Sequence, residues 1–166
     1  MRIKNTDITI KTIGWLQIIG GVTGIGLMAY LMLNTGEING AILFILLTGL
    51  TLFIFSVYAG KNILGKKTKK TGIILSIVNQ ILQIIQFDID GNGISYSSGI
   101  RFLLGLKNDS LNFDFGIITS NFNMSINTDS TDFELMINIV ALILAVILID
   151  ILKEVKNKKT MANNVS

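Results

Sequence analysis

The segment from Ile13 to Leu33 contains no charged residue, and it constrains the fold more than any other feature of the chain. As an α-helix it would be about 31 Å long, enough to cross the roughly 30 Å hydrocarbon core of a bilayer. Arg2 and Lys4 precede it, but the apolar stretch is too long for a secretory signal peptide, and no small-x-small cleavage site follows. We therefore expect a retained transmembrane helix.

Three further apolar runs cover residues 41–64, 72–87 and 133–152. Hydrophobic residues make up 50% of the 166 residues, charged residues only 15%, and the mean hydropathy is +0.62. A soluble chain this short could not bury so much apolar surface, because small domains leave a large share of their surface exposed. The sequence therefore predicts a membrane all-α bundle of four transmembrane helices, at about 13–33, 41–64, 72–87 and 133–152, with a small antiparallel β-meander inserted between helices 3 and 4.

The distribution of charge predicts the orientation of these helices. Of the 14 Lys and Arg residues, only Arg101 and Lys107 fall in the segment 88–132. All the others lie before the first run, around the second loop or after the fourth run, and the positive-inside rule places that side in the cytoplasm. Both termini, including a basic tail at 153–166, are then cytoplasmic, and segment 88–132 is extracytoplasmic. Abundant Ile, Asn and Lys suggest an AT-rich bacterial genome, hence a multi-pass protein of the inner membrane.

The third run differs from the others because it carries a stripe of uncharged polar residues. Unsatisfied amides in hydrocarbon are costly, so the stripe should face other helices or a wet cavity. Packing through interhelical hydrogen bonds, with Gln17 and Asn138 as partners, is the simpler interpretation, and a polar pathway for a transported molecule is the alternative. The residues of this intramembrane polar stripe are Ser76, Asn79, Gln80, Gln83 and Gln86.

Glycines in the first run favour close packing of helices. Gly20 and Gly24 form a small-xxx-small pair, which lets two helix backbones approach each other. The spacing of Gly21, Gly24 and Gly26 is the reverse of a dinucleotide-binding fingerprint, and no βαβ pattern surrounds them. We expect packing within the bundle or in a homodimer, and no nucleotide cofactor.

The start of the outer segment resembles the opening of a calcium-binding loop. Asp88, Asp90 and Asn92 supply oxygen at the first, third and fifth positions. The twelfth position is Gly99 where a bidentate Glu is needed, so the motif is incomplete. A turn is therefore the preferred interpretation, with weak calcium binding as the alternative and no firm metal site.

The rest of segment 88–132 has the alternation of half-buried strands. Apolar and polar residues alternate over 111–117 and again over 121–127, and residues 100–106 form a further run. With turns near 107–110 and 119–121, this pattern predicts a meander of three or four strands. Its apolar face must rest on the membrane, on helix ends or on a partner.

No catalytic signature is present. The chain has no Cys and no His, which removes thiolate chemistry and the commonest general base and metal ligand. The only candidate groups for a membrane hydrolase are the outer carboxylates Asp88 and Asp90 with Arg101. We expect a non-enzymatic accessory or interaction subunit with an extracytoplasmic contact surface, and a small transporter or channel component as the alternative. Its partners would be the lipid bilayer and a second copy or another membrane protein, without cofactor or nucleic acid.

Overall fold

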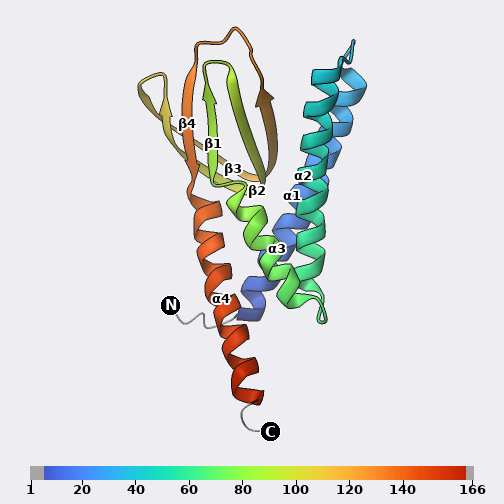
Figure 1. Cartoon of the computed structure of the whole chain (residues 1–166), viewed down its shortest axis with the longest axis vertical. Helices are drawn as coiled ribbons and strands as arrows, with labels where there is room; N and C mark the ends of the chain where they lie inside the picture. The colour runs from blue at the N-terminus through green and yellow to red at the C-terminus, as the bar shows by residue number, and fades with distance from the viewer. Residues whose placement is uncertain (1–5, 164–166) are drawn as a thin grey trace.

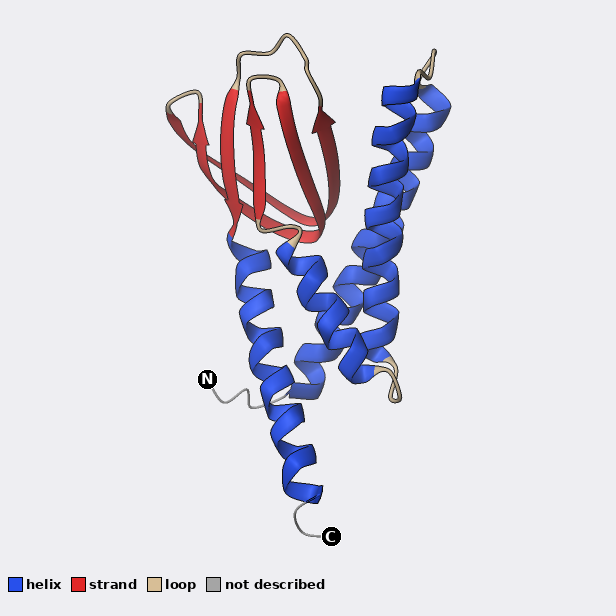
Figure 2. Ribbon diagram, viewed as in Figure 1, coloured by secondary structure: helices blue, strands red, loops and turns tan. Residues whose placement is uncertain are grey.

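The computed structural model describes residues 6–163, in which four helices and a four-stranded antiparallel sheet follow one another (Figures 1 and 2). Arg2 and Lys4 lie outside the described residues, as do the last three positions of the predicted basic tail. The helices are α1 (Thr6–Asn34), α2 (Gly40–Leu64), α3 (Lys69–Ile81) and α4 (Ile139–Asn163), and the strands are β1 (Ile85–Ile89), β2 (Asn92–Lys107), β3 (Ser110–Ser125) and β4 (Phe133–Asn138).

Two helices, α1 and α2, are long and apolar enough to cross a membrane. They have 29 and 25 residues and form an antiparallel hairpin (Figure 1). Asn39 caps the start of α2, because its side-chain oxygen accepts a hydrogen bond from the backbone N–H of Ile42 at 2.9 Å. The first apolar run lies within α1, which begins seven residues earlier than predicted, and the second lies within α2, which begins one residue earlier.

The prediction of a four-helix membrane bundle is wrong. The helix α3 has only 13 residues, about 20 Å of helix. The helix α4 has 25 residues, but charged side chains appear from Asp150 onward and occupy the part predicted as a tail. Neither is a candidate membrane span within residues 6–163.

The physical reason is that the third apolar run passes from helix to strand and the fourth from strand to helix. Residues 85–89 and 133–138 alternate apolar and polar side chains, and they form β1 and β4 in place of helical turns. Most apolar residues of β1 and β4, among them Phe87 and Leu135, point to one exposed face, whereas Gln86 and Met136 point to the other face and are buried. Hydropathy averaged over a window does not register this alternation.

The four strands form a strongly curved sheet that we call the β-cup. β1 pairs with β4, and β2 pairs with β1 through its first residues and with β4 through its last, so these three strands close on one another. β3 pairs with β2 over nearly its whole length. The β2–β3 hairpin bends where the register shifts between Gly99 and Arg101, and the positive φ angles of Gly99 (109°) and Ile118 (54°) mark this bend.

An antiparallel sheet lies between α3 and α4, but its strand order, β1-β4-β2-β3, is not that of the predicted meander. The turn near residues 107–110 joins β2 to β3, and its Asn108 and Asp109 have positive φ. The turn predicted at 119–121 is wrong, because β3 continues through these residues and only bends at Ile118. One long strand thus replaces two short ones.

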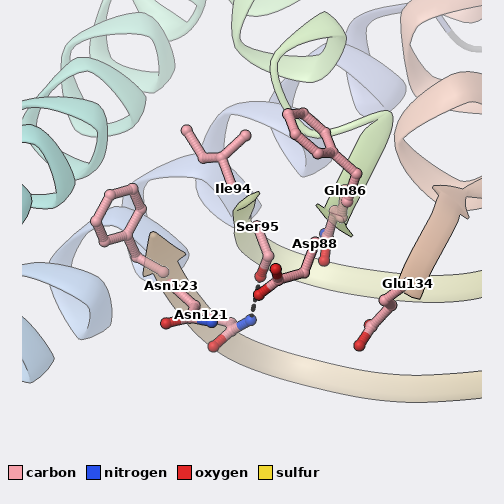
Figure 3. Close-up of a pocket in the computed structure, with 9 residues that line it drawn as sticks. Gln86, Asp88, Ile94, Ser95, Asn121, Asn123 and Glu134 are labelled. Atoms are coloured by element: carbon pink, nitrogen blue, oxygen red, sulfur yellow. Dashed lines mark hydrogen bonds between the residues drawn. The ribbon is translucent and has the colours of Figure 1, made fainter. Parts of the chain in front are cut away.

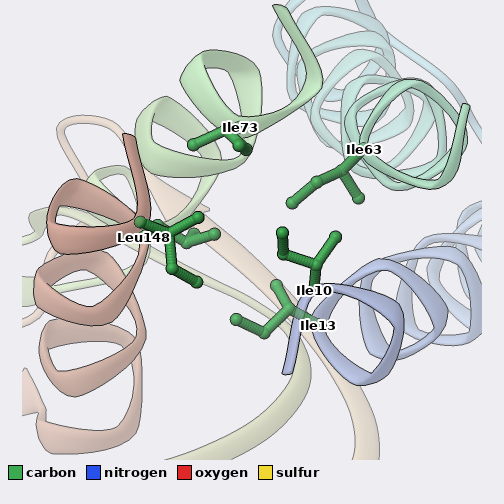
Figure 4. Close-up of a cluster of buried hydrophobic side chains, with 6 residues drawn as sticks. Ile10, Ile13, Ile63, Ile73 and Leu148 are labelled. Atoms are coloured by element: carbon green, nitrogen blue, oxygen red, sulfur yellow. The ribbon is translucent and has the colours of Figure 1, made fainter. Parts of the chain in front are cut away.

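Two clusters of buried apolar side chains hold the helices and the sheet together. One cluster joins all four helices near the end where α2 meets α3 (Figure 4) and includes Ile13, Ile63, Ile73 and Leu148. The other cluster, with Phe53 and Tyr96, joins α1 and α2 to the β-cup. The sheet therefore packs beside the far halves of α1 and α2 (Figure 2).

Glycines permit this close packing, but not only between helices. A side chain at Gly24 would collide with the ring of Phe53 on α2. A side chain at Gly20 would collide with the backbone of Ser98 and Gly99 on β2. Of the predicted packing pair, Gly24 thus packs against helix α2 and Gly20 packs against the sheet.

Candidate functional site

The polar stripe runs along α3, through the turn after it and into β1. Ser76, Asn79 and Gln80 lie on α3, Gln83 lies in the turn, and Gln86 lies on β1. All five are buried, with at most 4% of each residue exposed. The polar stripe thus continues from a helix into a strand, and all its residues stay in the protein interior.

Hydrogen bonds from this stripe join α3 to α1 and α2. The Ser76 hydroxyl donates to the side-chain oxygen of Gln17 at 2.8 Å. The Asn79 amide donates to the Ser56 hydroxyl at 3.2 Å, and that hydroxyl is 3.0 Å from the backbone oxygen of Gln17. These four residues come from three helices, and each side chain is at most 1% exposed.

The same network continues to strand β2. The Tyr96 hydroxyl lies 3.1 Å from the Asn79 side-chain oxygen and 3.0 Å from the backbone oxygen of Leu52. The side-chain oxygen of Gln83 accepts from the backbone N–H of Ser98 at 2.8 Å, and the Ser98 hydroxyl lies 3.0 Å from the Ser56 hydroxyl. We call Gln17, Ser56, Ser76, Asn79, Gln83, Tyr96 and Ser98 the polar core.

Burial also sets the chemistry of the one titratable group in the polar core. Desolvation raises the pKa of the Tyr96 hydroxyl above its usual value, and hydrogen bonds from Ser56 and Ser98 oppose that change. The hydroxyl therefore stays neutral at physiological pH and acts as a hydrogen-bond donor. A neutral, bonded phenol suits a structural role.

Asn138 does not join this network. It precedes α4, and its side-chain oxygen accepts from the backbone N–H of Ala141 at 3.2 Å, as an N-cap does. The same oxygen accepts from the backbone N–H of Phe102 at 3.3 Å, which ties β2 to the start of α4. Gln17 is thus the one predicted partner that contacts the stripe within the described residues.

The residues of the incomplete calcium motif form a tight hairpin between β1 and β2. Asp90 and Gly91 occupy the turn with φ angles of 48° and 73°, which suits the two-residue hairpin turns that need positive φ at both positions. The side-chain oxygen of Asn92 accepts from the backbone N–H of Asn127 at 3.1 Å. Among the residues with described side chains, no group of three acidic, His or Cys residues could hold a metal ion.

The inside of the β-cup contains a polar cavity of about 400 Å³ (Figure 3). Sequence reasoning identified only Gln86 and Asp88 as candidates here, because the other residues come together through strand pairing. The alternation of Asn121 and Asn123 with apolar neighbours was the available signal. The polar residues that line the cavity are Gln86, Asp88, Ser95, Asn121, Asn123 and Glu134.

Ion pairs balance most of the charge inside the β-cup. Arg101 contacts Asp114 at 2.6 Å, and Lys107 contacts Glu134 at 3.0 Å. The hydrogen bond to Glu134 and the charge of that carboxylate raise the pKa of Lys107 above its usual value. Asp88 accepts a hydrogen bond from Ser125 at 2.8 Å through one oxygen, while its buried Oδ1 has no hydrogen-bond partner.

The outside of the β-cup is apolar. Along the first half of β3, Leu111, Phe113, Phe115 and Ile117 are between 59% and 75% exposed. Between them, Asn112 and Asp114 point to the inner side. This polar-inside, apolar-outside arrangement is the reverse of a sheet that rests on a hydrophobic core.

No protein-family model, curated protein or solved structure is significantly similar to this chain.

Proposed function

We propose that this chain is a non-enzymatic membrane protein that acts by binding another membrane protein through strand β3. In this proposal α1 and α2 anchor it in a bacterial inner membrane, with the basic end of the molecule in the cytoplasm. Lys66, Lys67, Lys69 and Lys70 lie at that end, between α2 and the first turn of α3.

The exposed outer face of β3 is the observation that carries the proposal. Leu111 and Phe113 are 75% and 71% exposed. Neighbouring large apolar side chains with such exposure mark an interaction surface. In the described residues, β3 has one strand neighbour, β2, so its other edge offers unpaired backbone groups. The edge lacks the lysines and prolines that usually protect such strands.

The β-cup contacts the middle of α1 and α2, and this position supports a protein partner in preference to lipid alone. Ser120 on β3 lies 2.7 Å from Thr23 of α1, and the Tyr96 hydroxyl lies 3.0 Å from the backbone oxygen of Leu52 on α2. Thr23 and Leu52 are central in the apolar spans, so a bilayer around those helices would also surround the sheet. Unpaired backbone groups are costly in hydrocarbon, and an added strand from a partner would satisfy them.

Crosslinking in intact membranes tests this proposal. A photoreactive residue at Phe113 should give a discrete crosslinked product of higher mass, identified by mass spectrometry. The same residue at Asn112, which points to the inner side of the same strand, is the matched control and should give none. Crosslinks from Phe113 to lipid alone would contradict the proposal.

A transport function receives less support from the same geometry. The amides of the polar stripe make hydrogen bonds within the polar core, as they would in a packing role. A transport pathway needs polar groups that a solute can reach, and Ser56 and Asn79 are 0% exposed. The transporter alternative would regain support if Gln83→Leu abolished solute flux while the amount of folded protein stayed unchanged.

A further inference from the structure

The cavity inside the β-cup has a composition that suits a ligand more than a structural core. Its polar residues come from β1, β2, β3 and β4, so the cavity exists only when all four strands have paired. The volume of about 400 Å³ lies within the range of small-molecule sites. Figure 3 shows Asp88 extending from β1 toward Ser95 and Asn121.

Asp88 is the charged group of this cavity that makes no ion pair among the described side chains, although Lys107, which is paired with Glu134, is near enough to interact with its charge. Glu134 is paired with Lys107, and in the part of the chain with described side chains no Lys or Arg lies within ion-pair distance of Asp88. One carboxylate oxygen of Asp88 accepts from the Ser125 hydroxyl, but the other is buried without a hydrogen-bond partner. A buried carboxylate oxygen without a hydrogen-bond partner is unfavourable unless a ligand binds it.

The neighbouring groups determine what kind of ligand fits. Asp88 and Glu134 supply carboxylate oxygens and Asn121 and Asn123 supply amide oxygens, while the Ser95 hydroxyl accepts from the Asn121 amide at 2.8 Å. A primary ammonium group carries one positive charge and three N–H donors, which matches one unpaired carboxylate and its neighbouring oxygens. A phosphate or carboxylate ligand would meet only like charge at Asp88.

We propose that the cavity of the β-cup binds a small organic cation with a primary ammonium group, and that Asp88 holds this group. The contact surface on β3 and this cavity lie on opposite faces of the sheet, so the two proposals can fail separately. The ammonium group could belong to a free amine or to an ethanolamine headgroup of a lipid, and both offer the same donors and charge.

Calorimetric titration of the full-length protein tests the proposal. Ethanolamine added to protein in phosphatidylcholine nanodiscs should bind at one saturable site, and acetate should not bind. Asp88→Asn should weaken the binding of ethanolamine at least about tenfold, because a charge-assisted hydrogen bond is lost. The matched control Asp90→Asn, which removes the same charge two residues away in the hairpin turn, should leave the affinity nearly unchanged.

Replacing the lipid distinguishes the two sources of the ammonium group. If a headgroup occupies the cavity, protein in phosphatidylethanolamine nanodiscs should lose the titration with free ethanolamine. If only free amines enter, the titration should be the same in both lipids. Either result supports an ammonium site, since phosphatidylcholine has no N–H donor.

A second variant keeps the proposal testable if Asp88→Asn does not fold. Asn123→Leu places an apolar side chain at an exposed position that lines the cavity, without changing charge. It should also weaken ethanolamine binding. Equal binding by the wild type, Asp88→Asn and Asn123→Leu, or no binding by the wild type at about 10 mM ethanolamine, would overturn the proposal.

Discussion

The polar core and the interior of the β-cup both bury polar side chains, but they differ in how those groups are satisfied. In the polar core, Asn79 bonds to Ser56 and Tyr96, each at most 2% exposed, and the one buried atom of this network without a partner, Gln17 Nε2, belongs to an uncharged amide. In the β-cup, the Asp88 carboxylate has one hydrogen-bonded oxygen and one without a partner, beside a cavity of about 400 Å³.

This difference separates groups that stabilise the fold from groups available to a ligand. Polar side chains that bond to one another across α1, α2, α3 and β2 fix the relative positions of these elements. A carboxylate oxygen without a partner lowers stability and can accept a hydrogen bond from a ligand. Substitutions in the two regions should therefore change stability in opposite directions.

The largest effect is expected in the polar core. Asn79→Leu removes hydrogen bonds to Ser56 and Tyr96 and should lower the free energy of unfolding by about 3 kcal/mol. Val78→Leu is the matched control, since Val78 is the neighbouring residue on α3 and is 42% exposed. Thermal unfolding in detergent, followed by circular dichroism, measures both variants. Equal melting temperatures would show that the network does not stabilise the fold.

A smaller loss is expected from Tyr96→Phe. The change removes only the hydroxyl and leaves the buried oxygen of Asn79 without this donor, which should cost about 2 kcal/mol. The ring, which packs 5.5 Å from the ring of Phe53 between centroids, is kept. The same unfolding measurement applies. A double variant with Asn79→Leu should lose less than the sum of the two, because both act on one hydrogen bond.

The sequence alone predicted the hairpin of α1 and α2 well and the second half of the fold poorly. Runs 13–33 and 41–64 lie within α1 and α2, because uncharged helices of this length leave a strong hydropathy signal. Residues 85–89 and 133–138 carried a strand signal, seen in Phe87, Asp88 and Ile89, that their high hydropathy concealed. The sequence showed the alternation, but not that β1 and β4 pair with each other.

The sequence predicted the polar stripe better than the cavity of the β-cup, because only the polar stripe is formed by residues close together in the chain. The polar stripe is local in sequence, so its shared face could be predicted from the spacing of Ser76, Asn79 and Gln83. The cavity of the β-cup combines Asp88, Asn121 and Glu134, which are far apart in the chain. Only the long-range pairing of the strands brings them together, and no local pattern encodes that pairing.

Asp88→Asn should have the opposite effect on stability in the absence of ligand. The amide keeps an oxygen for the Ser125 hydroxyl and removes a charge that has a buried oxygen without a partner, so we expect a gain of about 1 kcal/mol. Thermal unfolding without amines in the buffer measures this gain, with Asp90→Asn as the charge-matched control. A clear loss of stability would show that the carboxylate stabilises the empty fold and would remove the contrast with Asn79.

The smallest effect concerns the ion pair at the edge of the β-cup and its dependence on pH. The bond to Glu134 raises the pKa of Lys107, so the pair stabilises the fold below the usual lysine pKa of about 10.5 and loses this contribution as the pH rises above that value. Because the Lys107 side chain is 48% exposed, Glu134→Gln should cost no more than about 0.5 kcal/mol at neutral pH. Asp129→Asn in the β3–β4 loop is the charge control. The difference in melting temperature between Glu134→Gln and the wild type should shrink at pH values above about 10.5, and a difference that grows there would contradict the stabilising role of the pair.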